Sequence, residues 1–378
     1  MAYNRRRSPR RAGLRRRTFS NIKRPLIIGG IVLAFAALVV LFLALFTGVF
    51  APTPLFTELP VSSGAVVESA GECIYYLKGT TLTCADNRGE AKWSTKFSAG
   101  QQALAVSESL VCLYNDSTAT VIDTDKNPLF TLPQSDFQIL EVVCGENALA
   151  VLTQISSEDS STQYLRLFDA SGKEVSRIDL QKAEVLDFGF SGSGDSLWYL
   201  TLDTSGVYPI SQITTYSVAG NTMTGLYQIY DQLVNRVEFL QSDMYVCGTT
   251  YLTCYDTFGE KKSETLIYGT RCVATCRAGS DQLFALAPYS DEETAATVRV
   301  LSSAGLDTLI QLPSGVTHFA LSSSKVYAYA GSTVYVYNLS GEFDEAIELE
   351  FPVESVSPLT STSVLISSGE HRYIMNLK

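Results

Sequence analysis

A short hairpin-like segment that recurs along the chain constrains the fold more than any other feature. Residues 81–93 read TLTCADNRGEAKW, which is an apolar strand, an Asp-x-x-Gly turn and a second strand. Related segments begin at Thr118, Tyr164, Ile213, Tyr251, Val298 and Val334, and the half-copy RYIMNL lies near the end. The turn centres are roughly 36 to 50 residues apart, a spacing typical of four-stranded propeller blades.

A second set of turns gives the number of blades. Each recurring hairpin is preceded by another with a polar tip: SAGE, SES, CGEN, SGSGD, LQSD, AGSD, LSSS and TSTS. No segment after residue 62 has a sustained helical period. The sequence therefore predicts an all-β fold with one eight-bladed β-propeller over residues 62–378. Seven blades are the alternative if the last blade does not form.

The last blade contains only three strands in its own stretch of sequence, which ends with RYIMNL. A ring left open there would expose an unpaired sheet edge. The segment LFTELPV (55–61) precedes the first blade and is available to pair with that edge. We therefore expect residues 51–61 to form a short linker and the outer strand that closes the ring.

The charges divide the chain into a basic tail and an acidic body. Ten of the 28 basic residues lie within residues 1–24, whereas the first acidic residue is Glu58. The remaining chain carries 18 basic and 39 acidic side chains. An acidic body argues against nucleic-acid binding, which requires a positive surface.

An apolar run joins these two parts. Residues 26–50 form 25 consecutive positions without a charge, enough for a helix to cross a hydrocarbon core of about 30 Å. A signal peptide would have a shorter apolar region of about 7 to 15 residues. We expect a transmembrane helix over 25–50 that contacts the lipid bilayer through 26–50.

The basic tail (1–24) then stays in the cytoplasm by the positive-inside rule. The protein is expected in the cell membrane as a single-pass protein with an extracytoplasmic propeller. Two alternatives for the tail remain open, a twin-arginine export signal at Arg16 and Arg17 and a contact with anionic lipid.

Three extended loops make one face of the propeller the predicted binding surface. In a blade with strands a to d from the channel outward, the b–c loops and d-to-a links share one face. The loops at 156–163, 203–212 and 288–297 all belong to this face, opposite the c–d face that the short linker would place near the membrane. The alternative is a set of tolerated surface insertions. The candidate binding residues are Glu158, Asp159, Tyr208, Tyr289, Asp291, Glu292 and Glu293.

Residues suited to chemistry are sparse. The only two histidines, His318 and His371, lie in or next to strand patterns, where we expect structural roles. Asp123, Asp125 and Asn127 have the spacing of a calcium loop but lack its glycine and distal glutamate, so they predict an Asx turn. We therefore predict no catalytic, cofactor-binding or metal-binding residue, and a protein that is not an enzyme.

The eight cysteines lie mostly inside apolar strand patterns, which favours buried free thiols. One or two cross-strand disulfides are the alternative. No Cys-x-x-Cys pair occurs, which argues against a zinc ribbon or a thioredoxin-type site.

Residues 84–93, CADNRGEAKW, resemble the motif that docks neighbouring blades in PQQ-like β-propellers. Asp86, Gly89 and Trp93 match it, and the resemblance implies that they hold the first blade in the ring. Together with the basic tail and the single span, the chain resembles an uncharacterised family of single-pass, membrane-anchored propellers of Gram-positive bacteria, a domain of unknown function. A more distant likeness is to the lipoprotein propellers of outer-membrane assembly, whose lipidation cysteine is missing here.

These features favour a membrane-anchored binding or scaffolding module for a protein, peptide or glycan of the cell envelope. The alternatives are a quinoprotein-like or hydrolytic enzyme that uses the central channel, and a ligand sensor that signals through the helix. Nothing in the chain matches the calcium and cofactor residues of quinoproteins, so no cofactor is expected. A propeller fold alone does not decide between these functions.

Overall fold

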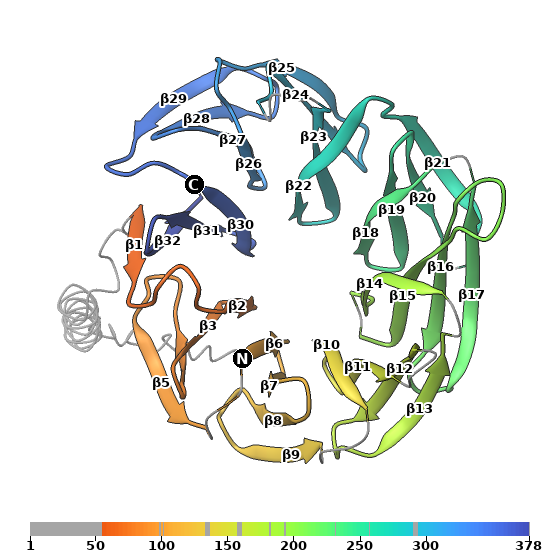
Figure 1. The fold of residues 1–378 in the computed structure, drawn as a ribbon. Helices are drawn as coiled ribbons and strands as arrows, with labels where there is room; N and C mark the ends of the chain where they lie inside the picture. The colour runs from red at the N-terminus through yellow and green to blue at the C-terminus, as the bar shows by residue number, and fades with distance from the viewer. Residues whose placement is uncertain are drawn as a thin grey trace, which may run out of the picture. The chain divides into compact units, whose positions relative to one another are not determined.

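The propeller is seen in a computed structural model, which describes residues 55–97, 100, 102–132, 137–156, 161–180, 183–192, 194–230, 232–256, 258–289 and 294–377. Eight antiparallel sheets of four strands surround a central channel (Figure 1). This arrangement confirms the predicted eight-bladed β-propeller. The predicted tail and transmembrane helix, residues 1–50, lie outside the described residues.

Among the residues that the structure describes, no helix has the length and apolar character needed to cross a membrane.

The first four blades follow the chain in order, each from its innermost to its outermost strand. They are β2 (Val67–Ala70), β3 (Cys73–Lys78), β4 (Thr81–Ala85) and β5 (Ala91–Lys96); β6 (Ala103–Val106), β7 (Leu110–Tyr114), β8 (Ala119–Asp123) and β9 (Pro128–Leu132); β10 (Gln138–Cys144), β11 (Ala148–Ser156), β12 (Ser161–Asp169) and β13 (Glu174–Asp179); β14 (Glu184–Phe190), β15 (Ser196–Asp203), β16 (Ile210–Ser217) and β17 (Thr222–Ile229).

Blades 5 to 7 repeat this order, and blade 8 takes its outer strand from the other end of the described chain. They are β18 (Val234–Leu240), β19 (Asp243–Gly248), β20 (Tyr251–Tyr255) and β21 (Lys261–Leu266); β22 (Thr270–Ala278), β23 (Asp281–Pro288), β24 (Thr297–Ser302) and β25 (Asp307–Gln311); β26 (His318–Leu321), β27 (Lys325–Ala330), β28 (Thr333–Asn338) and β29 (Phe343–Glu348); β30 (Ser355–Thr360), β31 (Ser363–Ser368), β32 (His371–Asn376) and β1 (Phe56–Leu59).

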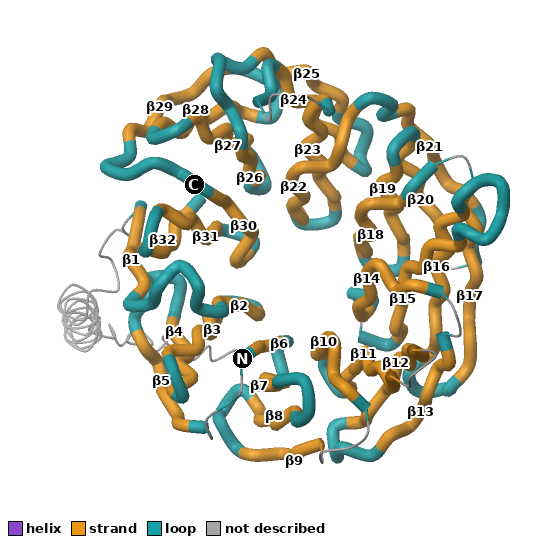
Figure 2. Tube along the Cα trace, in the orientation of Figure 1, coloured by secondary structure: helices purple, strands orange, loops and turns teal. Residues whose placement is uncertain are grey.

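The position of a strand within its blade explains its composition. The second strand of a blade lies between two neighbouring sheets, and β31 is accordingly buried along its whole length. The outermost strands face solvent on one side, so β21 reads KKSETL and is mostly exposed. Loops and turns of different lengths connect the strands within each blade, as Figure 2 shows. The polar outer strand and apolar middle strands are the pattern that made the repeats visible in the sequence.

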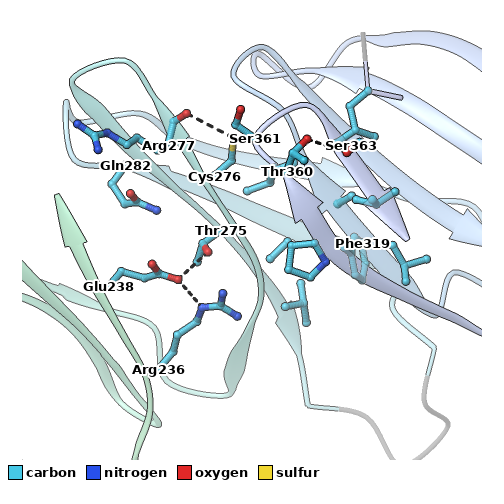
Figure 3. A pocket seen from close by; sticks show the side chains of 18 of the residues that line it. Arg236, Glu238, Thr275, Cys276, Arg277, Gln282, Phe319, Thr360, Ser361 and Ser363 are labelled. Carbon is cyan, nitrogen blue, oxygen red and sulfur yellow. Dashed lines mark hydrogen bonds and ion pairs between the residues drawn. The ribbon is translucent and has the colours of Figure 1, made fainter. Parts of the chain in front are cut away.

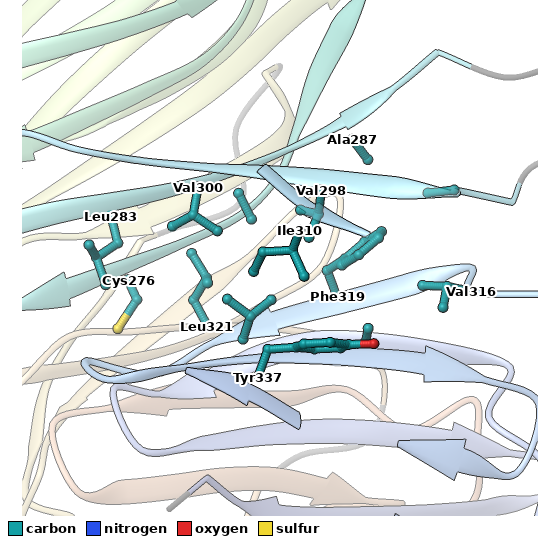
Figure 4. Close-up of a cluster of buried hydrophobic side chains, with 14 residues drawn as sticks. Cys276, Leu283, Ala287, Val298, Val300, Ile310, Val316, Phe319, Leu321 and Tyr337 are labelled. Carbon is teal, nitrogen blue, oxygen red and sulfur yellow. The ribbon is translucent and has the colours of Figure 1, made fainter. Parts of the chain in front are cut away.

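The hydrophobic core lies between adjacent blades. Figure 4 shows the cluster between blades 6 and 7, where Val298, Val300 and Ile310 pack against Phe319 and Tyr337. Similar clusters fill the other interfaces, so each blade is stabilised mainly by its two neighbours. All eight cysteines are free, and six of them are buried.

The two ends of the described chain close the ring. Strand β1 pairs antiparallel with β32, from Phe56 opposite Met375 to Leu59 opposite Arg372. Leu59 is only 1% exposed and packs in the core between blades 8 and 1. His371 Nδ1 lies 2.6 Å from Glu58 Oε1, so this histidine joins the two strands. The outer strand of blade 8 thus comes from the 55–61 segment, as the sequence predicts.

The recurring turn contacts both neighbouring blades. In blade 1 the Asp86 carboxylate accepts hydrogen bonds from the backbone N–H groups of Arg88 and Glu90, each at 2.9 Å. Gly89 has a φ of 77°, and a Cβ there would lie 2.9 Å from a methyl carbon of Thr57 in β1. On the other side, the Trp93 indole N–H donates to the Thr124 carbonyl of blade 2 at 3.1 Å.

The same packing recurs at the turn of blade 3. Gly172 has a φ of 82°, and a Cβ there would lie 2.6 Å from the Phe130 ring in β9. Gly305 of blade 6 occupies the same kind of turn with a φ of 99°, but nothing lies within 4 Å of its Cβ position. Only some turn glycines are therefore held by close contact with the preceding blade.

Candidate functional site

Two of the seven predicted binding residues lie in the part of the chain that the structure describes. Tyr208 is 72% exposed and Tyr289 is 53% exposed, and each belongs to a loop between the second and third strands of its blade. The five acidic residues predicted beside them lie outside the described residues. They are Glu158, Asp159, Asp291, Glu292 and Glu293.

The structure adds three exposed tyrosines to the same face. Tyr230 directly follows the outer strand β17, Tyr268 follows β21, and Tyr251 begins β20. These positions lie at the b–c loops or d-to-a links of blades 4, 5 and 6. We call the five residues Tyr208, Tyr230, Tyr251, Tyr268 and Tyr289 the tyrosine rim.

Hydrogen bonds hold the backbone beneath the tyrosine rim. The Tyr230 hydroxyl donates to Gln228 Oε1 at 2.8 Å, and the Tyr251 N–H donates to Gln232 Oε1 at 2.8 Å. In blade 6, the Tyr289 N–H donates to the Gly269 carbonyl at 3.0 Å. The bonds from Tyr251 to Gln232 and from Tyr289 to Gly269 each join a b–c loop to the neighbouring d-to-a link.

The channel is the second candidate region, and bulges in the innermost strands shape it. The pairing register shifts at Leu140 in β10, Leu186 in β14 and Asn235 in β18. Such a bulge changes the direction in which the following side chain points. The residues after these three bulges are Glu141, Asp187 and Arg236, so charged groups stand on the strands that line the channel.

Three carboxyl groups on the innermost strands, Glu68, Glu141 and Asp187, have raised pKa values. Burial raises the pKa of Glu68 in β2, and it also raises that of Glu141, where the charge of Asp187 adds to the effect. Burial also raises the pKa of Asp187, against the opposing attraction of Arg236. Surrounding protein disfavours the charged form of each group. In the part of the chain that can be described, no three His, Cys, Asp or Glu side chains come together as a metal site.

A cavity of about 310 Å³ opens from the channel among blades 5 to 8 (Figure 3). On one wall, Arg236 Nε donates to Glu238 Oε1 at 2.7 Å, and the Thr275 hydroxyl donates to the same oxygen at 2.8 Å. On another wall, the hydroxyls of Thr360 and Ser363 are 2.7 Å apart. We call this cavity the channel pocket. No sequence signal identified it, because its walls come from strands of four different blades.

His318 and Asp123, which the sequence raised as candidates for chemistry, make contacts typical of structural residues. Burial lowers the pKa of His318, whose Nδ1 lies 2.8 Å from the Thr317 hydroxyl. Asp123 accepts the Asn127 backbone N–H at 2.7 Å and its side-chain amide at 2.8 Å, which forms the expected Asx turn.

Comparison with solved structures supports the fold. BamB from Moraxella catarrhalis is 10% identical with a TM-score of 0.52, and the match covers 85% of this chain and 99% of BamB. The WD40 domain of SCAP from fission yeast is 10% identical with a TM-score of 0.57, over 85% of this chain and 97% of that domain. At such identities the likeness shows the propeller fold alone.

Comparison with sequences gives a family but no characterised relative. No curated protein matches the chain. The model of a family of unknown function, DUF5711, matches residues 58–376. The match therefore covers nearly the whole propeller, from within the closing strand β1 to the end of β32.

Proposed function

The chain belongs to the DUF5711 family of unknown function, and we propose from its surface residues that it is a non-enzymatic binding and scaffolding module. The tyrosine rim is the proposed contact with a protein partner. The observation that carries this proposal is the clustering of five exposed tyrosines on one face of three adjacent blades.

The chemistry of tyrosine supports this assignment. A tyrosine side chain offers a large apolar ring and a hydroxyl, yet it loses few rotamers on binding. Tyrosine is enriched in protein interfaces and in the residues that dominate their affinity. Exposed apolar side chains at Val207, Leu233 and Leu266 surround the rim and enlarge the surface that a partner could cover.

The proposed setting is the outer face of a cell membrane. The apolar run at 26–50 and the basic tail at 1–24 support a single-pass anchor with a cytoplasmic N-terminus. Strand β1 begins at Phe56, and its first residue lies at the c–d side of blade 8. The proposed partners of the tyrosine rim are proteins of the cell envelope.

Capture from solubilised cell envelopes tests the proposed contact. The full-length tagged chain is compared with a Tyr230→Ala, Tyr268→Ala double variant. We expect the double variant to lose partner capture without a change in melting temperature, because both side chains are exposed.

The control is Phe258→Ala. Phe258 is 90% exposed but lies in the c–d turn of blade 5, on the opposite face. This variant should capture the partner as well as the parent does. Capture that survives the tyrosine substitutions, or that depends equally on Phe258, would contradict the role of the tyrosine rim.

A further inference from the structure

The channel pocket lies away from the tyrosine rim. Arg277 and Gln282 flank the turn between β22 and β23, and Thr360 and Ser363 flank the turn between β30 and β31. Both are turns between the first and second strands of a blade. The pocket is therefore near the a–b side of the channel, whereas the tyrosine rim is on the b–c face. A ligand there would bind independently of a partner on the rim.

Gln282 is a buried polar residue without a side-chain partner. It is only 3% exposed, and its backbone N–H and carbonyl both bond to Ser303 at 2.9 Å. Among the described residues, none hydrogen-bonds its side-chain amide, which points into the pocket (Figure 3). The amide faces the open space of the pocket, where a ligand atom can replace solvent as its hydrogen-bond partner. This amide is therefore available to a ligand.

The charged groups of the pocket favour an anion. Glu238 is paired with Arg236 and also accepts the Thr275 hydroxyl, so the charges of this pair largely balance. Arg277 forms no ion pair with any residue in the described part of the chain; its Nε donates to the Gly279 carbonyl at 3.3 Å. Arg277 is exposed at the edge of the pocket, and it leaves the lining residues with one uncompensated positive charge.

The wall that faces these groups is apolar except at the β30–β31 turn, where Thr360, Ser361 and Ser363 also line the pocket. Phe319 and Leu377 are buried there, and Val356 and Pro358 of β30 complete that side. Pockets of about 300 to 1,000 Å³ with apolar walls and a few fixed polar groups are typical of small-molecule sites. A volume of about 310 Å³ fits a small ligand with an apolar body.

From these contacts we propose that the channel pocket binds a small molecule or chain end with one carboxylate and an apolar body. The Gln282 amide and the Arg277 guanidinium donate hydrogen bonds to the carboxylate. The apolar body lies against Phe319 and the β30 wall. The proposal does not depend on the tyrosine rim or on its partner.

Calorimetric titration of the full-length chain with a matched pair of probes tests this assignment. N-acetyl-L-phenylalanine carries the carboxylate, and N-acetyl-L-phenylalaninamide replaces it with a neutral group of the same shape. We expect the acid to bind with a Kd of about 1 mM or tighter and the amide about tenfold more weakly. Equal affinities, or no binding of the acid at millimolar concentration, would overturn the proposal.

Variants locate the binding site. Gln282→Leu and Arg277→Gln should each lower the affinity for N-acetyl-L-phenylalanine about tenfold, since each removes one hydrogen-bond donor to the carboxylate. The control Arg271→Gln, an exposed site at the other end of β22, should bind as the parent does. If neither pocket variant changes the affinity, the ligand binds elsewhere and the assignment fails.

Thermal unfolding separates a ligand-binding role of Gln282 from a structural one. An amide without a partner adds nothing to stability, so Gln282→Leu should melt at or above the parental temperature. A clear loss of stability would show that the amide has a partner in the fold, which would overturn the reasoning.

A last pair of probes identifies the source of the carboxylate. The peptide N-acetyl-Ala-Ala-Phe has the same terminal group as N-acetyl-L-phenylalanine at the end of a longer chain. Binding of either probe supports the shared chemistry. Tighter binding of the peptide assigns the pocket to polypeptide C-termini, and tighter binding of the small acid assigns it to free metabolites.

Discussion

Gly172→Ala gives a quantitative test of how the recurring turns dock the blades. The new Cβ would lie 2.6 Å from the Phe130 ring, in a residue with a φ of 82°. A left-handed conformation costs a non-glycine residue about 1 to 2 kcal/mol, and overpacking costs about 1 to 3 kcal/mol more. The expected loss in the free energy of unfolding is therefore about 2 to 5 kcal/mol.

Gly305→Ala is the matched control, because it has a positive φ in the same kind of turn but an open Cβ position. Its free energy of unfolding should fall only by the cost of the left-handed backbone conformation, about 1 to 2 kcal/mol. Urea unfolding of both variants, followed by circular dichroism, measures the difference. Adding Phe130→Ala to Gly172→Ala should also reduce the cost of the glycine substitution. Equal losses for the two glycines would refute the idea that contact with the preceding blade fixes Gly172.

Three further perturbations test single contacts by urea or pH titration. Leu59→Ala should cost about 2 to 5 kcal/mol, because it leaves a cavity in the core that closes the ring; a loss below 1 kcal/mol would argue against closure through β1. Trp93→Phe should cost about 1 kcal/mol, since its bond to blade 2 is lost; an unchanged midpoint would show that this bond contributes nothing. Burial opposes ionisation of Glu174, but hydrogen bonds from Arg177 and Arg166 outweigh it and lower its pKa to about 2. Because this pKa is depressed, the ionised Glu174 stabilises the fold at pH values above its unfolded pKa near 4.5, and this stabilisation is lost as the pH falls toward 2. Glu174→Gln should therefore flatten the dependence of stability on pH in that range. An unaltered dependence would contradict the ion pair.

The sequence predicted the propeller well because each blade repeats its local signals. The Asp-x-x-Gly turn, the polar a–b tips and the apolar middle strands recur in order, so counting them gave eight blades. The closing strand was also predictable, since the last blade lacked one strand and 55–61 was the unassigned apolar segment. These features depend on short-range patterns, which a sequence displays directly.

The candidate sites depend on features that short-range patterns do not show. Tyr230 and Tyr268 occur in short links, and only the ring places them beside the extended loops. In β10 the bulge at Leu140 breaks the alternation and changes the direction of Glu141, a register shift that composition does not reveal. Gln282 reads as one polar residue in a strand, and only the structure shows that its amide has no partner.

Closure by the two ends of the propeller has a consequence for the order of folding. Glu58 and His371 are 313 positions apart, so β1 leaves the ribosome long before β32 exists. At about 5 to 20 residues per second, this wait lasts roughly 15 to 60 s. During that time β1 has no strand to pair with, and the first blade has no neighbour on one side. Seven blades can assemble during synthesis, but the joint between first and last forms only after translation of β32, which makes it the step most exposed to mispairing with another chain.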